Sequence, residues 1–343
     1  MLQSIKSSAR ISVSFLVSTL LLTGCFNERS LEDSLDDYNE RLSYVLDIDL
    51  PATAYPSLPA LAASSTIRQD IEALSINLRE FYALQDCELG RVVAQRNTSL
   101  GKSQLPSQRL VYESKLLSVL DACKIALDES HSALTTMLNN WQQQKRSDYA
   151  KTWANLIQTS KEFRLSLNTP EQYLSMHSSA DANASINALY FIDSVKRIAE
   201  QVDSSPIDSA ELEAQLQTVE STRLPASIWR TQLLLSGNLT KLTTALTPQL
   251  QNISCPDGRA SEKAKILRNV FYLFFIEEIQ PVASLINQYH YKLLPLWNGF
   301  QKHPALHADF KRYIAEQSDT NFSAYSQAMH THVSLWQGFL KRC

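Results

Sequence analysis

The sequence predicts an all-α, disulfide-stapled helical bundle that follows a lipidated N-terminal tether. Apolar residues recur at spacings of three and four along most of the 343 residues, whereas the alternating Val, Ile and Thr runs typical of strands are nearly absent. Glycine is scarce, with seven in the whole chain, and long stretches also lack proline. Five cysteines are present, and the first comes directly after an apolar N-terminal segment.

That N-terminal segment has the anatomy of a bacterial signal peptide. Lys6 and Arg10 form a positive region, and residues 11–22 form an apolar region that is too short to span a bilayer. The sequence Leu-Thr-Gly-Cys, which ends at Cys25, resembles a lipobox. We therefore expect residues 1–24 to be removed and Cys25 to carry acyl chains, because two or more chains make a membrane anchor effectively permanent. The alternative is an ordinary cleaved signal that happens to contain a cysteine.

The expected location is the outer membrane, facing the periplasm. Position 26 is Phe, whereas an Asp there favours retention in the inner membrane. Loss of Lys6 and Arg10 with the signal peptide changes the formal net charge from −3 to −5. A mildly acidic chain without a basic block is a poor nucleic-acid binder, so we expect a membrane contact through the lipid anchor and no nucleic-acid partner.

Four cysteines remain in the mature chain, and an even number in an oxidising compartment predicts two disulfides. Three connectivities are open in principle. Cys87 and Cys123 both lie 18 residues from position 105, which falls in an expected turn between two antiparallel helices. The helical layout therefore favours Cys87–Cys123, and it leaves Cys255 to join the final residue, Cys343.

The helical periodicity divides the chain into elements. We expect residues 25–65 to form the tether, with a short amphipathic helix over 26–47 and a Pro-rich strap over 48–65, and residues 66–343 to form the helical domain. A division into two lobes near Pro206 is the alternative. Within the domain, the expected helices cover residues 66–96, 107–144, 147–167, 182–203, 208–220 and 224–251, a long helix after the N-cap Ser261, and 319–341.

One stretch of the long helix, Val270–Ile276, is apolar all round, which predicts that it lies inside the bundle. Glu277, Glu278 and Pro281 interrupt the apolar run, which argues against a membrane span. Pro295 is expected to end or kink the helix further on.

The most distinctive stretch is Arg96-Asn97-Thr98-Ser99-Leu100-Gly101-Lys102, followed by residues 106–113 (PSQRLVYE). Together with Asn269-Val270-Phe271 and Gln280-Pro281, it resembles a family of gammaproteobacterial lipoproteins, the domain-of-unknown-function family 3080 (DUF3080). The resemblance extends over essentially the whole mature chain. It implies a localisation and an architecture, but no chemistry and no functional residues, because the family carries no established activity.

The residues themselves suggest one candidate binding site. Arg96, Asn97, Lys102 and Arg109 gather around a polar turn at the start of a helix, where backbone donors and guanidinium groups suit an anion. The alternative is a solvated turn whose arginines pair with acids such as Glu88 and Glu113. The Gly101-Lys102 pair lacks the spacing and the preceding strand of a phosphate-binding P-loop.

No catalytic motif is apparent, and we expect no metal and no cofactor. Glu277 and Glu278 could act as buried carboxylates of a hydrolase, or one could pair with a base while the other reaches the surface. The histidine pairs His303/His307 and His330/His332 lack the spacing of metal ligands and predict surface histidines. The favoured hypothesis is non-catalytic binding or scaffolding of an envelope protein or acidic envelope component; the alternatives are an envelope hydrolase and a carrier of an apolar ligand.

Overall fold

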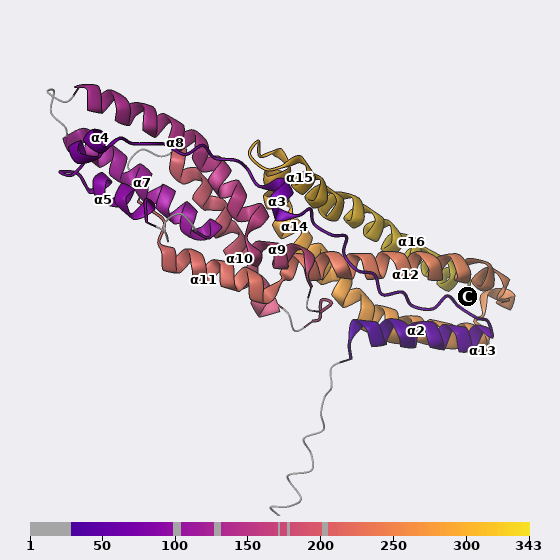
Figure 1. Ribbon diagram of the computed structural model, residues 1–343. Coiled ribbons are helices and arrows are strands. Elements are labelled where there is room, and N and C mark those ends of the chain that lie inside the picture. The colour runs from indigo at the N-terminus through magenta and orange to yellow at the C-terminus, as the bar shows by residue number, and fades with distance from the viewer. Residues whose placement is uncertain (1–28, 99–103, 127–131, 171, 177–178, 201–204) are drawn as a thin grey trace, which may run out of the picture.

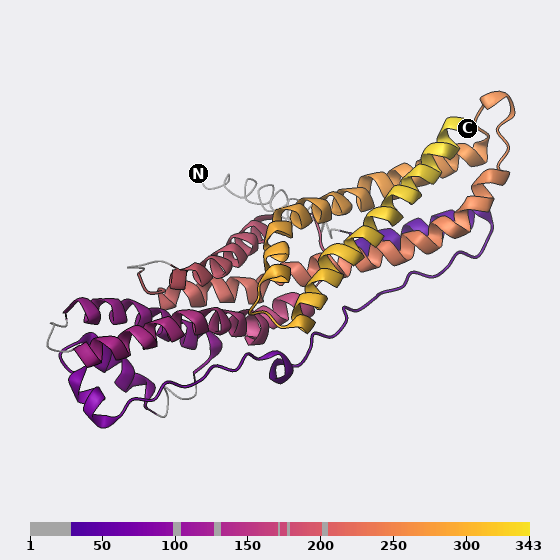
Figure 2. The ribbon, with the colours of Figure 1, turned by 90° about the horizontal axis from the view of Figure 1, so that it is seen from above.

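The computed structural model describes residues 29–98, 104–126, 132–170, 172–176, 179–200 and 205–343. It confirms an all-α bundle, and the described residues contain no strand. The molecule is elongated, with α4, α5 and α7 at one end and α13 at the other (Figures 1 and 2). Two predicted site residues, Cys25 and Lys102, lie outside the described residues.

The helices follow one another along the chain, with extended connections on both sides of α3. The first half contains α2 (Leu31–Leu46), α3 (Ser64–Ile67), α4 (Leu78–Ala83), α5 (Glu88–Arg96), α7 (Pro106–Ala126), α8 (Ser132–Thr159), α9 (Lys161–Asn168), α10 (Ser179–Ser194) and η2 (Val195–Glu200). The second half contains α11 (Ser209–Thr222), α12 (Leu224–Asn252), η3 (Pro256–Gly258), α13 (Glu262–Val270), the π-helical η4 (Phe271–Ile279), α14 (Gln280–Lys302), α15 (Ala308–Ala315), η5 (Glu316–Thr320) and α16 (Asn321–Arg342).

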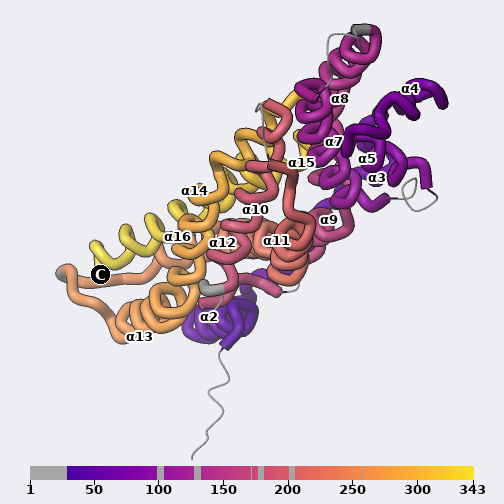
Figure 3. The backbone as a smooth tube through the Cα atoms, turned by 90° about the vertical axis from the view of Figure 1, so that its left-hand side faces the viewer, coloured from indigo at the N-terminus to yellow at the C-terminus, as the bar shows by residue number. Residues whose placement is uncertain are grey.

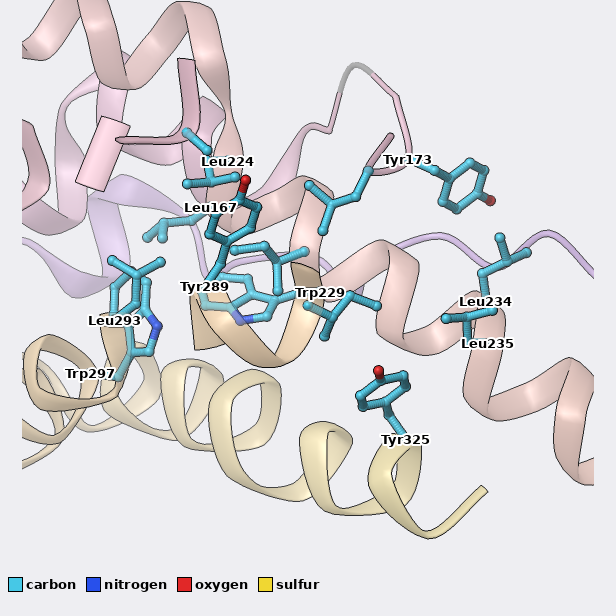
Figure 4. Close-up of a cluster of buried hydrophobic side chains, with 14 of the residues drawn as sticks. Leu167, Tyr173, Leu224, Trp229, Leu234, Leu235, Tyr289, Leu293, Trp297 and Tyr325 are labelled. Carbon is cyan, nitrogen blue, oxygen red and sulfur yellow. The ribbon is translucent and has the colours of Figure 1, made fainter. Parts of the chain in front are cut away.

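A large hydrophobic core extends through most of the bundle. Figure 4 shows part of it, where the Trp229 and Trp297 rings lie 5.4 Å apart. Elsewhere in this core, Trp153 packs edge-on against Phe300, with ring centroids 5.8 Å apart. The Trp153–Phe300 contact joins residues on opposite sides of Pro206, and the large core includes residues from both halves of the chain.

A smaller core lies at the end formed by α4, α5, α7 and α8, and contains Leu84, Leu89, Val92, Leu116, Val119, Leu120, Cys123 and Leu138. Both predicted disulfides are present, and each joins Cα atoms 5.4 Å apart. Cys87–Cys123 ties α5 to α7 within this smaller core, and Cys255–Cys343 ties the C-terminus to the loop before α13. Loops of 36 and 88 residues correspond to roughly 4 kcal/mol each in the chain-entropy account of disulfide stabilisation.

The helix predicted over residues 66–96 is wrong, because the chain there forms α3, an extended segment, α4 and α5. A capping box starts α4: the Asn77 side chain accepts from the Glu80 amide, and the Glu80 carboxylate accepts from the Asn77 amide. A Cβ at Gly90 would lie 2.6 Å from the Leu84 carbonyl oxygen, so only glycine lets α5 pass this close to the end of α4.

The helix predicted over residues 107–144 is likewise divided, into α7 and α8, on either side of the undescribed residues 127–131. The two helices pack together as an antiparallel pair. Lys124 donates to the Gln142 side chain at 2.7 Å, and Arg146 pairs with Asp121 at 3.2 Å. This antiparallel pairing brings residues from distant turns of the expected single helix side by side.

Residues 31–65, the described part of the predicted tether after α2 begins, pack on the bundle. Leu35, Tyr38 and Leu42 of α2 are almost fully buried in the large core. The strap then runs along the bundle towards α4 (Figure 2). The Asn238 side chain exchanges two hydrogen bonds of 2.8 Å with the Ala54 backbone, so a side-chain amide pairs with the strap as a strand would.

A second amide holds the extended segment between α3 and α4. The Asn155 side chain accepts from the Gln69 amide at 2.7 Å and donates to the Gln69 carbonyl at 2.9 Å. The backbones of the strap and of this extended segment therefore have hydrogen-bond partners although neither belongs to a sheet.

Ser261 caps α13 as predicted, and its side chain accepts from the Ala264 amide. From Glu262 to Lys302 the helix is long and apolar enough, by length and composition, to cross a membrane. It is nevertheless packed in the large core, where it lies beside α2 (Figure 3). Pro295 lies inside α14, which continues to Lys302, so the helix does not end there.

The sequence predicts that the apolar run of this helix is buried on all sides, but the structure buries only part of it. Phe271 and Phe275 are buried, but Tyr272 and Leu273 are 47% and 52% exposed. The neighbouring helices cover one side of the run, and seven consecutive apolar residues necessarily place some on the other side.

Candidate functional site: a cation-lined pocket

A pocket of about 460 Å³ opens between α5, α7, α8 and the extended segment before α4. This volume is within the usual range for small-molecule sites. Its described lining is Ala73, Leu74, Ser75, Ile76, Val93, Arg96, Asn97, Arg109, Tyr112, Leu116, Leu120, Trp141 and Lys145. Three of these side chains are cationic and none is a carboxylate, while most of the others are apolar.

Three helices each supply one cation. Arg96 is the last residue of α5, Arg109 lies in the first turn of α7, and Lys145 lies in the middle of α8. On α7, Arg109, Tyr112 and the two leucines at 116 and 120 follow spacings of three and four, which places them along one face of the helix. The Cys87–Cys123 disulfide fixes α5 against α7, so the pocket is preorganised by a covalent bond.

The carboxylate of Glu113, which is 3% exposed and does not itself line the pocket, contacts two of the pocket cations. Its Oε1 accepts from Lys145 Nζ at 3.1 Å and pairs with Arg109 Nη2. A buried carboxylate between two cations is compensated for its lost hydration, and removal of one partner from such a group is strongly destabilising. Glu113 therefore positions both cations, and one negative charge faces two positive ones.

The second guanidinium nitrogen of Arg109 marks where a ligand could be held. Nη1 is buried and has no hydrogen-bond partner among the described residues. The guanidinium also lies over the Tyr112 ring, 5.6 Å from its centroid. A buried donor without an acceptor is costly, so an acceptor supplied by a ligand would be favoured at this nitrogen.

Electrostatics in the pocket favour a negative ligand. Burial, together with the nearby Arg109 charge, lowers the pKa of Arg96. Burial, with a smaller contribution from the Glu113 charge, raises the pKa of Tyr112 to about 12, so its hydroxyl stays neutral at neutral pH. Both shifts reflect a partly desolvated site in which like charges lie close together. An anion between the two guanidinium groups would relieve that repulsion.

The structure brings together three of the four residues that the sequence selects as a binding site. Arg96, Asn97 and Arg109 line the pocket, with Asn97 exposed at its edge, while Lys102 lies outside the described residues. The alternative pairing with acids also holds in part, since Arg109 pairs with Glu113. Glu88 instead pairs with Lys115, at 2.9 Å.

Sequence reasoning misses Lys145, Tyr112 and Trp141 as parts of this site. The spacing of four between Trp141 and Lys145 places them on one face of α8, but it does not indicate which helix they meet. Trp141 packs beside the smaller core, whereas the other four tryptophans are buried in the large core.

The carboxylates considered for hydrolysis lie elsewhere. Glu278 pairs with Arg29 at 3.0 Å, and Glu277 is exposed. This arrangement matches the alternative in which one acid pairs with a base and the other reaches the surface. Neither residue lines the cation-lined pocket.

The prediction of surface histidines is wrong for His332, which is fully buried. Its Nε2 accepts from Trp336 Nε1 at 3.1 Å and lies 3.0 Å from the Tyr38 hydroxyl, while Nδ1 lies 2.8 Å from Thr243 Oγ1. Because an indole nitrogen can only donate, the ring proton is assigned to Nδ1. Burial lowers the pKa of His332 to about 3, so the ring is neutral.

The remaining histidines of the two predicted pairs differ in exposure. His330 is exposed, His307 caps α15 by accepting from the Asp309 amide, and His303 packs on Trp153 with ring centroids 4.6 Å apart. Within the described ranges, no group of three His, Cys, Asp or Glu side chains is placed to hold a metal ion.

The fold and the pocket define an all-α protein with two disulfides and a cation-lined pocket. Residues 35–343 match the family described as "Protein of unknown function (DUF3080)", and the chain belongs to this family. No curated protein and no solved structure matches the chain.

Proposed function

We propose that this protein is a non-catalytic, lipid-anchored binding protein of the cell envelope, and that the cation-lined pocket holds an anionic group of its ligand. The observation that carries the proposal is the buried, unpartnered Arg109 Nη1 in a pocket whose described lining has three cations and no carboxylate. A phosphate or carboxylate oxygen accepts charge-assisted hydrogen bonds from guanidinium groups, and these are the stronger class of hydrogen bond.

Head-group charge is the property to test. Isothermal titration of the purified protein with octyl phosphate should give saturable binding, whereas octanol and octyltrimethylammonium, which share the chain, should bind at least tenfold more weakly. Arg96→Gln should weaken binding of octyl phosphate by at least tenfold, because a hydrogen bond to a charged group contributes about 1.5–3 kcal/mol.

The matched control is Arg91→Gln, which removes an exposed arginine from the same helix outside the pocket lining. Its affinity for octyl phosphate should stay within twofold of the wild type. Equal losses in both variants, or equal binding of the phosphate and the quaternary ammonium compound, would contradict an anion site.

The anchor is a separate part of the proposal and rests on the signal-peptide pattern that ends at Cys25. Cys25→Ala should abolish acylation, measured by incorporation of an alkyne-labelled fatty acid, and should release the protein from the outer-membrane fraction. A variant that still carries lipid would overturn the lipoprotein assignment without affecting the pocket.

A further inference from the structure

The apolar walls of the pocket indicate a second property of the ligand, beyond the charge that the cations indicate. The apolar side chains Leu74 and Ile76 come from the extended segment, Leu116 and Leu120 from α7, and Trp141 from α8. They form a surface beside the charged group, because Arg109 lies on the same face of α7 as Leu116 and Leu120, about two and three turns before them. A small inorganic anion would contact the cations and leave this surface wetted.

We propose that the ligand is an amphiphile with a single anionic head group, whose head lies at Arg96 and Arg109 and whose apolar chain lies against Leu74, Leu120 and Trp141. This inference rests on the proposed anion-binding function and adds the class of ligand. Binding sites for small molecules are commonly apolar walls with a few polar groups that fix orientation, and this pocket has that composition.

The extended segment between α3 and α4 forms one wall of the pocket. It is held at Gln69 by the Asn155 amide and at Asn77 by the cap of α4, and the residues that line the pocket, Ala73–Ile76, lie between these two points. Leu74 is half-buried and is the wall residue that can be changed with the least damage to the smaller core.

Chain length distinguishes this inference from the broader function. Each methylene that leaves water for an apolar surface contributes about 0.8 kcal/mol, which corresponds to roughly fourfold in affinity. In the series ethyl, butyl, hexyl and octyl phosphate, the dissociation constant should fall roughly fifteenfold for every two carbons added, until the chain fills the pocket. An affinity that is the same for all four compounds would refute the amphiphile and leave the anion site standing. No binding of any member would refute both.

A matched pair of leucines tests the position of the chain. Leu74→Ser should weaken octyl phosphate about fivefold to tenfold and leave ethyl phosphate unchanged. Leu78→Ser, four residues further on at a site that is 68% exposed and outside the lining, should change neither. If Leu74→Ser and Leu78→Ser change the affinity for octyl phosphate equally, the proposed position of the alkyl chain against Leu74 is refuted.

Fluorescence gives an independent reading, because Trp141 is the tryptophan of the described pocket lining. Bound 8-bromooctyl phosphate should quench a component of the emission that is absent in Trp141→Phe, and octyl phosphate should reverse the quenching in competition. Fatty acids of matched length should compete as well if the site recognises a carboxylate head. Quenching that persists in Trp141→Phe would place the chain elsewhere and contradict the inference.

Discussion

Acid should destabilise this protein through His332, which is neutral and fully buried among Tyr38, Thr243 and Trp336. Burial lowers the pKa of His332 to about 3 in the folded protein, whereas an unfolded histidine titrates near 6.5. The unfolded state therefore binds a proton below pH 6.5 that the folded state does not bind until about pH 3. Stability that is fully present above pH 6.5 is lost as the pH falls through this window.

The magnitude follows from the unfolded pKa alone as long as the folded ring stays neutral. Between pH 7.5 and pH 5.0, the proton taken up by unfolded His332 lowers the free energy of unfolding by about 2 kcal/mol. Burial also lowers the pKa of His290, to about 4, so the wild type should lose more than this amount. The difference between wild type and a His332 variant isolates the contribution of His332.

Urea denaturation at pH 7.5 and pH 5.0 measures these values. In His332→Gln, the amide can still accept from Trp336, and the loss of stability between the two pH values should be about 2 kcal/mol smaller than in the wild type. His330→Gln, which changes an exposed histidine two residues away, should keep the wild-type loss. If His332→Gln loses as much stability as the wild type, the ring is not held neutral and the reasoning is refuted.

Three further outcomes test the packing. Gly90→Ala should lower the free energy of unfolding by about 1–3 kcal/mol in thermal denaturation, because the added Cβ would lie 2.6 Å from the Leu84 carbonyl oxygen. Gly338→Ala, where there is open space for a Cβ, should be neutral or stabilising. Equal effects of the two substitutions would contradict the close approach of α5 to Leu84. Asn238→Ala should remove both hydrogen bonds to Ala54 and speed limited proteolysis of the strap, and an unchanged cleavage rate would show that the amide does not hold it. Non-reducing peptide mapping should recover the pairs Cys87–Cys123 and Cys255–Cys343, and a peptide joining Cys87 to Cys255 would contradict the fold.

Local signals in the sequence predict much of the fold. The spacing of apolar residues predicts α12, α11 and α16 closely, and Ser261 predicts the start of α13. The equal distances of Cys87 and Cys123 from the turn predict their disulfide. Each of these features depends on residues within a few turns of one another or on a single hairpin.

Contacts between segments that are distant in the sequence are harder to predict from the sequence. Residues 113 and 145 lie 32 positions apart, and on one continuous helix they would be separated by about 48 Å. Only the division into α7 and α8 brings Lys145 to Glu113, so the third cation of the pocket cannot be found from periodicity. The hydrogen bonds between the Asn238 side chain and the Ala54 backbone join positions 184 residues apart, and no local sequence pattern indicates them.

The exposure of Tyr272 and Leu273 shows a related limit. An apolar run indicates that a helix is buried, but the number of its sides that are covered depends on which helices pack against it. For the candidate site, clustered basic residues in the sequence identify Arg96 and Arg109, while the apolar walls come from elements that only the tertiary structure brings together.

A crystal structure of the protein with octyl phosphate would show directly where the anionic amphiphile binds. We predict a phosphate oxygen within hydrogen-bond distance of Arg109 Nη1, the nitrogen without a partner among the described residues, and the alkyl chain against Leu120 and Trp141. An alkyl phosphate bound at saturating concentration on another surface, with this pocket empty, would contradict it.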